Sequence, residues 1–278
     1  MLRVGALLVF VVLVGATCQG VATALERREF PRPGRMVDVG GHQLHIYCLG
    51  EGSPTVVLEA PAEGMSATWG WVQPAVARST RVCSYDRAGL GWSDRSEVQD
   101  PAAVSGALHT LLIQAGETAP FIVAGHGLGA AFATLYASQF AGDTAALVLI
   151  DAPVDETGAP VRAMRGRVSR LSPWLARVGI LRATRTLSRG TTGLPEPSAG
   201  ALAAFLNRPD HLTEAASELS RWNEVATQAA DVSLRPGLPV TRLTVAGGDR
   251  VAFLVTESQA APVVSAILDA VATVRQTR

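Results

Sequence analysis

The stretch that most constrains this chain is residues 121–132, Phe-Ile-Val-Ala-Gly-His-Gly-Leu-Gly-Ala-Ala-Phe. Its apolar start, Phe121 to Ala124, predicts a buried strand, and the small residues from Leu128 onward predict a tightly packed helix. Glycines at 125, 127 and 129 mark a sharp turn between the two. A strand, a tight turn and a helix in this order are typical of a parallel sheet covered by helices.

The same alternation runs along most of the chain. The predicted strands are residues 55–58, 81–85, 121–124, 146–150 and 240–246, and a β-hairpin over residues 36–49 precedes them. The predicted helices are residues 68–77, 100–114, 128–140 and 261–274. This pattern predicts an α/β fold with a mostly parallel central sheet and helices on both faces.

Between residues 154 and 238 the strand signals disappear and amphipathic helical segments replace them. We interpret this segment as a helical cap inserted into the sheet domain. The predicted sheet domain therefore has two sections, residues 37–153 before the cap and residues 239–278 after it. A linker over residues 26–36 precedes the first section.

Composition limits the function. The chain has 278 residues, of which 48% are hydrophobic and 17% charged, which suits one large globular domain with a sizeable core. Its formal net charge is zero, so no general attraction to nucleic acid is expected.

The first segment bears on location. Residues Val4 to Leu25 contain no charged side chain and are numerous enough for a membrane-spanning helix, which predicts a single-pass N-terminal anchor over residues 1–25. The alternative is a signal peptide, because Ala22-Thr23-Ala24 fits an A-x-A cleavage pattern and would give a secreted or periplasmic protein.

A second unusual segment lies in the predicted cap. Residues 162–189 contain eight arginines and no acidic residue, and Leu171, Trp174, Leu175 and Val178 recur at helical spacing. One interpretation is a cap helix whose basic face is simply solvated. The other is a cap helix that lies on anionic lipid.

Taken together, these motifs resemble the α/β-hydrolase superfamily, and most closely membrane-anchored bacterial members with a helical cap. The resemblance covers nearly the whole chain. It rests on segments that occur in the family's order, namely residues 34–41, 57–60, 84–93, 125–129 and 147–151.

The resemblance implies a nucleophile elbow, G-x-S-x-G, with a serine on the turn, followed along the chain by an acid and a histidine. Here the nucleophile position is Gly127, which has no hydroxyl. Glycine reaches the strained backbone angles of such a turn easily, so the turn can persist without the chemistry. The family position of the acid falls on Asp249.

The histidine of the family is missing. The five histidines are His42, His45, His109, His126 and His211, so none follows the cap. One alignment places Phe253 at the vacated histidine position. In the alternative, residues 252–256 form the last strand and the histidine loop is deleted.

The resemblance also locates the two backbone donors of an oxyanion hole at Ala62 and Leu128. Glu63 would place a carboxylate near developing negative charge, although a solvent-facing side chain is the expectation we favour. His126 flanks the elbow, and in the family this side chain usually packs away from the substrate.

The remaining expectations concern cysteines and cofactors. In this family the strand with Cys48 lies beside the strand with Cys83, so we expect the two sulfurs to be close. A disulfide between them would indicate an oxidising compartment. No cysteine–histidine cluster has metal-ligand spacing and no glycine loop fits a phosphate, so we expect neither a metal nor another cofactor.

The sequence thus predicts a membrane-associated α/β-hydrolase-fold protein that is impaired as a serine hydrolase. Between the elbow and the cap, an apolar pocket is expected to bind a lipid or acyl-type ligand, and a protein partner is an alternative. The competing hypothesis is an active carboxylic-ester hydrolase, esterase-like or lipase-like, with a displaced nucleophile.

Overall fold

The computed structural model describes residues 2–98, 100–154, 168–245 and 253–277. A seven-stranded sheet runs through the centre in the order β1-β2-β4-β3-β5-β6-β7. Its strands are β1 (Arg35–Asp38), β2 (Gln43–Leu49), β3 (Thr55–Glu59), β4 (Val82–Tyr85), β5 (Phe121–His126), β6 (Thr144–Ile150) and β7 (Val240–Leu243).

The sheet is antiparallel at one edge and parallel elsewhere. β1 pairs with β2 and β2 with β4 in antiparallel fashion, whereas β4, β3, β5, β6 and β7 are parallel neighbours. Strands β3, β4 and β5 are buried along their whole length, because helices cover both faces. The predicted mostly parallel α/β sheet is confirmed.

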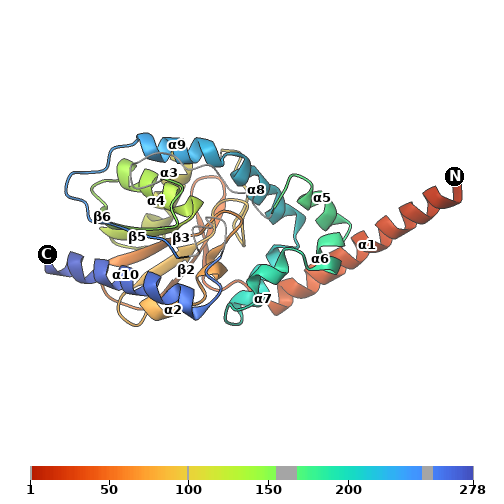
Figure 1. Ribbon diagram of the computed structural model, residues 1–278, viewed down its shortest axis with the longest axis horizontal. Helices are drawn as coiled ribbons and strands as arrows, with labels where there is room; N and C mark the ends of the chain where they lie inside the picture. Colours follow the sequence, from red (N-terminus) through yellow and green to blue (C-terminus); the bar gives the residue numbers. More distant parts are fainter. Residues whose placement is uncertain (1, 99, 155–167, 246–252, 278) are drawn as a thin grey trace.

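Helices α3 (Pro101–Gln114) and α4 (Leu128–Gln139) cover one face, and α2 (Val72–Val76) and α10 (Glu257–Gln276) cover the other (Figure 1). Each face has its own apolar cluster. Leu111 and Tyr136 belong to the cluster under α3 and α4, and Val263 and Ile267 to the cluster under α10. The predicted helix over residues 68–77 is instead a short 3-10 helix, η1 (Ser66–Trp69), followed by α2, because Gly70 and Pro74 interrupt it.

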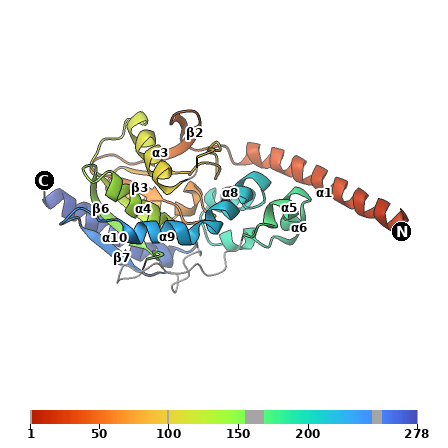
Figure 2. The same cartoon turned by 90° about the horizontal axis from the view of Figure 1, so that it is seen from above.

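The described part of the segment after β6, from residue 168 onward, is helical, as predicted. Its described elements include α8 (Pro209–Ser220), which packs against the other cap helices, and α9 (Trp222–Asp231), which packs on α4. The others are α5 (Ser172–Arg177), α6 (Ile180–Thr184), η2 (Ser188–Thr191) and α7 (Ser198–Phe205). Figures 1 and 2 show α5, α6, α7 and α8 at one end of the sheet domain, whereas α9 lies over α4.

The N-terminal helix α1 extends over Leu2–Glu29, past the predicted end at residue 25. Within the described residues, we find no helix with both the length and the apolarity needed to cross a membrane, so the predicted transmembrane helix is not supported. The second half of α1 contacts the cap instead. Buried Gln19 donates to the carbonyl of Asn207 at 2.7 Å, and Glu26 forms an ion pair with Arg182.

The edge near the C-terminus is shorter than the sequence suggests. β7 ends at Leu243 rather than residue 246, and residues 253–256 form a loop rather than the last strand. Thr256 and Gln259 then form a capping box at the start of α10. This N-cap accounts for the position at which the helix begins, at Glu257 rather than residue 261.

Candidate functional site

The turn between β5 and α4 has the geometry of a nucleophile elbow. Gly127 has φ of 54° and ψ of −123°, and its N–H donates to the carbonyl of Ile150 at 2.9 Å. Residues with a Cβ rarely adopt this φ, whereas glycine does so at little cost. The expected turn is present at the expected position, without a side chain on its central residue.

The flanking glycines allow a close backbone approach. A Cβ on Gly129 would lie 2.4 Å from the carbonyl oxygens of both Glu59 and Ala60, and a Cβ on Gly125 would lie 2.3 Å from the carbonyl oxygen of Gly129. The loop after β3 therefore rests directly on the start of α4. Any larger side chain would separate these backbones.

That contact brings the two expected oxyanion positions into one apolar cluster. Ala62 and Leu128 are both fully buried and share a cluster with Phe132, Trp222 and Val225. Leu128 is the first residue of α4, so no intrahelical acceptor exists for its N–H. Their role as oxyanion donors stays a prediction, and the cap helix α9 supplies the apolar wall beside them.

Glu63 is not solvent-facing, in contrast to our expectation. It is fully buried, its φ is 63°, and its Oε1 accepts a hydrogen bond of 2.8 Å from the N–H of Val168. The carboxylate therefore serves a backbone donor of the cap. Sequence reasoning missed this because Val168 is distant in the chain.

His126 lies beneath the elbow and beside an acid that sequence reasoning treated only as a strand end. Its Nε2 lies 3.3 Å from Oδ2 of Asp151, and its ring meets the ring of Trp69 edge-on at 6.4 Å. The side chains of His126 and Asp151 are almost fully buried. The pair sits at the carboxyl ends of β5 and β6, the edge at which α/β sheets bind ligands.

Two more histidines have structural partners. His211 accepts from the N–H of Gly91 through Nδ1 at 3.1 Å, and its Nε2 lies 3.2 Å from the carbonyl oxygen of Glu63. Burial lowers the pKa of His211, which favours the neutral ring. Nδ1 of His45 lies 2.9 Å from Asp86, and its other ring nitrogen lies against a backbone carbonyl. Neither ring has a nitrogen left over to act as a base.

The remaining two histidines lie away from the elbow. His109 of α3 stacks on Phe140 with ring centroids 4.0 Å apart. His42 lies in the loop between β1 and β2. All five histidines of the chain thus fall within the described residues, and His126 is the one adjacent to Gly127.

Asp249 lies outside the described residues, so its expected role as the acid stays a prediction. Phe253 is described and is 2% exposed. It packs in the apolar cluster of the cap with Met65, Leu90 and Phe205. At the position where one alignment places the missing histidine, the chain therefore has an apolar side chain that packs in the cap.

A buried ion network joins the sheet to the cap. Arg87 bonds Oε1 of Glu59 at 2.6 Å, the carbonyl of Ala60 at 2.7 Å, and both carboxylate oxygens of Glu218 on α8. Tyr85 donates to Glu59 as well. Burial raises the pKa of Glu59, against the opposing charge of Arg87. The network fixes the loop that leads from β3 to the expected oxyanion position.

A large cleft lies away from the elbow, and the expected pocket between the elbow and the cap stays a prediction. A cleft of about 1000 Å³ lies between the segment after α1, strand β2, α2, the cap segment before α7, and α10. Its walls include Leu49, Trp71, Trp92, Val264 and Leu268, and its lining contains no residue from 121 to 132.

Two buried polar groups in the cleft wall have no hydrogen-bond partner among the described residues. They are the Oγ of Ser66 and the Nε1 of Trp69, whose residues are 5% and 1% exposed. Unsatisfied buried donors are rare in native structures and call for an explanation. A ligand in the cleft would provide one.

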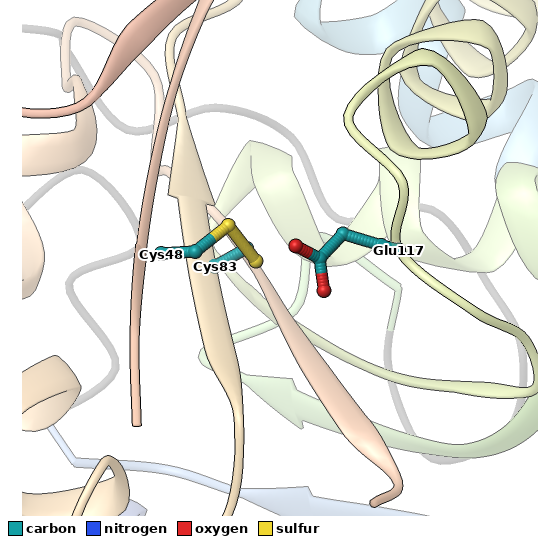
Figure 3. Close-up of side chains that lie close together, drawn as sticks. All are labelled: Cys48, Cys83 and Glu117. Atoms are coloured by element: carbon teal, nitrogen blue, oxygen red, sulfur yellow. A yellow bond between two sulfur atoms is a disulfide. The ribbon is translucent and has the colours of Figure 1, made fainter. Parts of the chain in front are cut away.

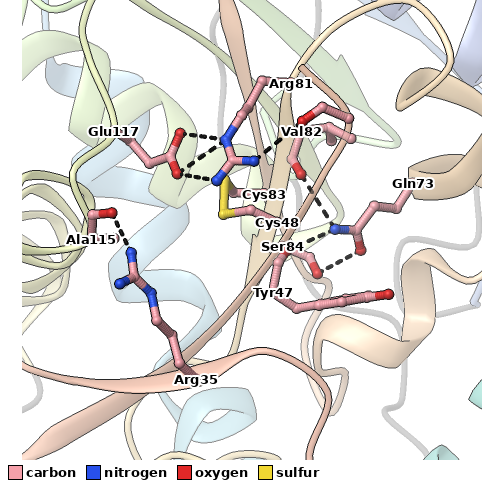
Figure 4. Close-up of a disulfide and its surroundings, with 11 residues drawn as sticks. Arg35, Tyr47, Cys48, Gln73, Arg81, Val82, Cys83, Ser84, Ala115 and Glu117 are labelled. Atoms are coloured by element: carbon pink, nitrogen blue, oxygen red, sulfur yellow. Dashed lines mark hydrogen bonds and ion pairs between the residues drawn. A yellow bond between two sulfur atoms is a disulfide. The ribbon is translucent and has the colours of Figure 1, made fainter. Parts of the chain in front are cut away.

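The sulfurs of Cys48 and Cys83 are close, as expected, and form a disulfide across β2 and β4 (Figure 3). Together with Glu117 they are the one described group with metal-ligand spacing. The sulfurs are bonded to each other, and Glu117 binds Arg81 at 2.7 Å (Figure 4). A disulfide offers no thiolate, so this group does not fit a metal.

Comparison with known proteins agrees with the fold. A model of the alpha/beta hydrolase family matches residues 52–276. The 2-hydroxy-6-oxo-2,4-heptadienoate hydrolase of Pseudomonas putida is 29% identical over 122 residues, which is 43% of this chain and 44% of that protein. An uncharacterised Schizosaccharomyces pombe protein is 29% identical over 125 residues, 44% of this chain and 23% of its own. The chain thus spans less than half the length of these curated relatives.

Solved structures show the same architecture. An epoxide hydrolase, CorEH, superposes with a TM-score of 0.64 at 15% identity, covering 86% of this chain and 98% of that one. A thermophilic esterase from Thermogutta terrifontis gives a TM-score of 0.57 at 16% identity, covering 86% and 98%. At these identities the likeness concerns the fold alone.

Proposed function

Because the chain belongs to the alpha/beta hydrolase family, we propose that it is a member without serine-hydrolase activity, which binds a ligand rather than cleaving one. The observation that carries this proposal is Gly127, which holds the elbow turn at φ of 54° with no nucleophile on it. A triad that lacks its nucleophile retains only residual catalysis.

The absence of a relay base supports the same proposal. No histidine follows His211 in the sequence, and His211 itself is held between Gly91 and Glu63. His126 is next to the turn, but its Nε2 lies 3.3 Å from Asp151, and we expect this contact to keep the ring from serving position 127. A serine placed on the turn would therefore lack the partner that activates its hydroxyl.

The ligand we propose is an acyl chain or similar lipid fragment, bound in the cleft beside α10. Its volume of about 1000 Å³ lies at the upper end of ordinary ligand pockets. Apolar walls such as Trp71 and Val264 suit an acyl chain. Ser66 and Trp69 would supply polar contacts, and Arg78 in the lining would pair with a carboxylate.

The catalytic half of the proposal is tested on the full chain with a fluorophosphonate probe and p-nitrophenyl esters. We expect neither labelling nor turnover, for the wild type or for Gly127→Ser. Esterase activity that appears in Gly127→Ser would show that a base reaches the turn, and would contradict the proposal. Folding of Gly127→Ser is checked by circular dichroism, so that inactivity is not confused with unfolding.

The binding half is tested by titration with a fluorescent polyunsaturated fatty acid. Ala261→Trp would fill the cleft from α10 and should weaken binding at least tenfold. Ala272→Trp is the matched control, since Ala272 is an exposed residue of α10 that does not line the cleft. Equal binding by both variants would refute the cleft as the ligand site and leave the catalytic half unaffected.

The alternative is an active ester hydrolase with a displaced nucleophile. The buried contact of His126 with Asp151 favours it, because a carboxylate next to a histidine is the arrangement that orients a general base. The solved structures of the same fold also include hydrolases by their printed names. Labelling that maps to Ser66 and disappears in Ser66→Ala would establish this alternative.

A further inference from the structure

The first half of α1 exposes apolar side chains around its whole circumference. Val4, Val9, Phe10 and Leu13 are each at least 60% exposed, and Val12 and Val14 are 48% and 45% exposed. At about 100° per residue, the consecutive positions 12, 13 and 14 already point in three different directions. A groove on a partner protein would cover one face of this helix, whereas an apolar medium covers all of it.

The second half of α1 is fixed to the cap, so the exposed half projects from a firm base. A Cβ on Gly15 would lie 2.2 Å from the carbonyl oxygen of Val178, which shows how closely the helix approaches the end of α5. Arg182 bonds both Gln19, at 2.8 Å, and Glu26. Figure 1 shows α1 continuing beyond the cap from this contact.

The cap presents its own apolar side chains beside α1. Leu171 and Trp174 are each 67% exposed, and Ile180 is 45% exposed. Figures 1 and 2 both place α5 and α6 next to α1. Tryptophan with one polar and one apolar edge is the side chain that favours the boundary between lipid headgroups and acyl chains.

The same stretch of the cap carries exposed positive charge. The guanidinium of Arg177 lies over the ring of Trp174, 4.8 Å from its centroid, and Arg170, Arg185 and Arg189 are exposed nearby in the sequence. Arginines near an anionic membrane surface are attracted to it. Because the whole chain has no net charge, this basic end is a local feature rather than a general one.

We propose that these residues form a membrane-binding end: Val4, Val9, Phe10, Val12, Leu13 and Val14 of α1, with Leu171, Trp174 and Ile180 of the cap. The first half of α1 enters one leaflet of an anionic bilayer, and α5 and α6 lie on its headgroups. Residues 4–14 carry no charge and would span about 17 Å at 1.5 Å per residue, too short to cross the hydrocarbon core, so this half of α1 lies obliquely in one leaflet with Arg3 at the headgroups. This inference is independent of the proposed ligand cleft.

The test is flotation of the full chain with phosphatidylcholine vesicles that contain or lack about 30% phosphatidylglycerol, an anionic lipid. We expect flotation with the anionic vesicles, and Phe10→Asp with Leu13→Asp should reduce the bound fraction at least tenfold. Ile113→Asp is the matched control, because Ile113 on α3 is likewise an exposed apolar residue, at 50%, but lies away from this end. Equal loss in the control, or no flotation of the wild type, would overturn the proposal.

Two further variants test the cap's contribution. Arg170→Gln with Arg177→Gln should remove most of the preference for anionic vesicles, whereas Arg242→Gln at the exposed strand β7 should not. Brominated lipids should quench wild-type fluorescence more than that of Trp174→Phe. Quenching that is unchanged by Trp174→Phe would refute contact of the cap with lipid. A defined oligomer that dissociates in the Phe10/Leu13 variant, without flotation of the wild type, would instead identify this end as a protein interface.

Discussion

Arg87 and Glu218 join the sheet domain to the cap through a doubly bonded ion pair, with 2.6 Å between Nε and Oε1 and 2.9 Å between Nη2 and Oε2. The two residues lie 131 positions apart in the chain and both are buried. Arg87 also holds Glu59 and the carbonyl of Ala60. The guanidinium of Arg87 therefore fixes both the position of the cap and the loop beside the elbow.

Removing the cap-side partner should be costly. Glu218→Ala leaves a buried guanidinium incompletely compensated, and breaking a buried pair in this way typically costs about 3–5 kcal/mol. Urea unfolding of the full chain measures the loss. Glu224→Ala on the exposed side of α9 is the control and should change the free energy of unfolding by less than about 0.5 kcal/mol. Equal, small effects of the two variants would show that Arg87 does not depend on Glu218.

The disulfide should be detectable by counting thiols. The chain has three cysteines, and Cys18 is the free one in the structure. Unfolded without reductant, the protein should therefore react with one equivalent of a thiol reagent, and with three after reduction. Three reactive thiols before reduction would contradict the bridge. By loop-closure entropy over a separation of 35 residues, reduction should lower the free energy of unfolding by about 3–4 kcal/mol.

His45 and Asp86 should make stability depend on pH. Burial alone would lower the pKa of His45, but the neighbouring Asp86 charge and hydrogen bonds raise it above its usual value. Stabilisation by protonated His45 is thus complete below about pH 6.5 and is lost as the pH rises through the higher folded-state pKa. Unfolding free energies measured from about pH 6 to about pH 9 should decline in the wild type.

His45→Asn should remove that decline, because no group titrates at the position. Asp86 adds a pH dependence of stability with the opposite sign at low pH. Burial favours its protonated form, yet His45 and the N–H groups of Ser66 and Trp92 lower its pKa. Its contribution is present above the usual carboxyl pKa and is lost as the pH falls through the lowered folded-state value. A pH profile unchanged by His45→Asn would assign the decline to other groups.

The elbow glycines should differ sharply from an ordinary helical glycine. Gly129→Ala would place a Cβ 2.4 Å from two carbonyl oxygens, so the backbones must separate, and a loss of at least about 3 kcal/mol is expected. Gly106→Ala in α3 meets nothing within 4 Å and should stabilise by about 0.5–1 kcal/mol. Thermal unfolding compares the two. Similar effects would indicate that α4 can shift away from the loop after β3.

Local patterns predicted most of the sheet domain. The strand predicted over residues 121–124, which extends to His126, the helix predicted over residues 100–114, and the helical cap all follow from apolar periodicity and capping residues. One prediction was wrong where local signals compete, because Gly70 and Pro74 divide a predicted helix. The N-terminal apolar run that predicts a membrane span docks its second half on the cap through Gln19, and a complete span is not supported among the described residues.

For the candidate site too, some features could be predicted from the sequence and others could not. The sequence alone determined that the elbow position is Gly127 and that no histidine follows the cap, because both are matters of residue identity and order. Only the tertiary structure decided that Glu63 is buried, that His126 meets Asp151, and that the large cleft lies beside α10 rather than at the elbow. Each of these depends on contacts between segments far apart in the chain, which no local pattern encodes.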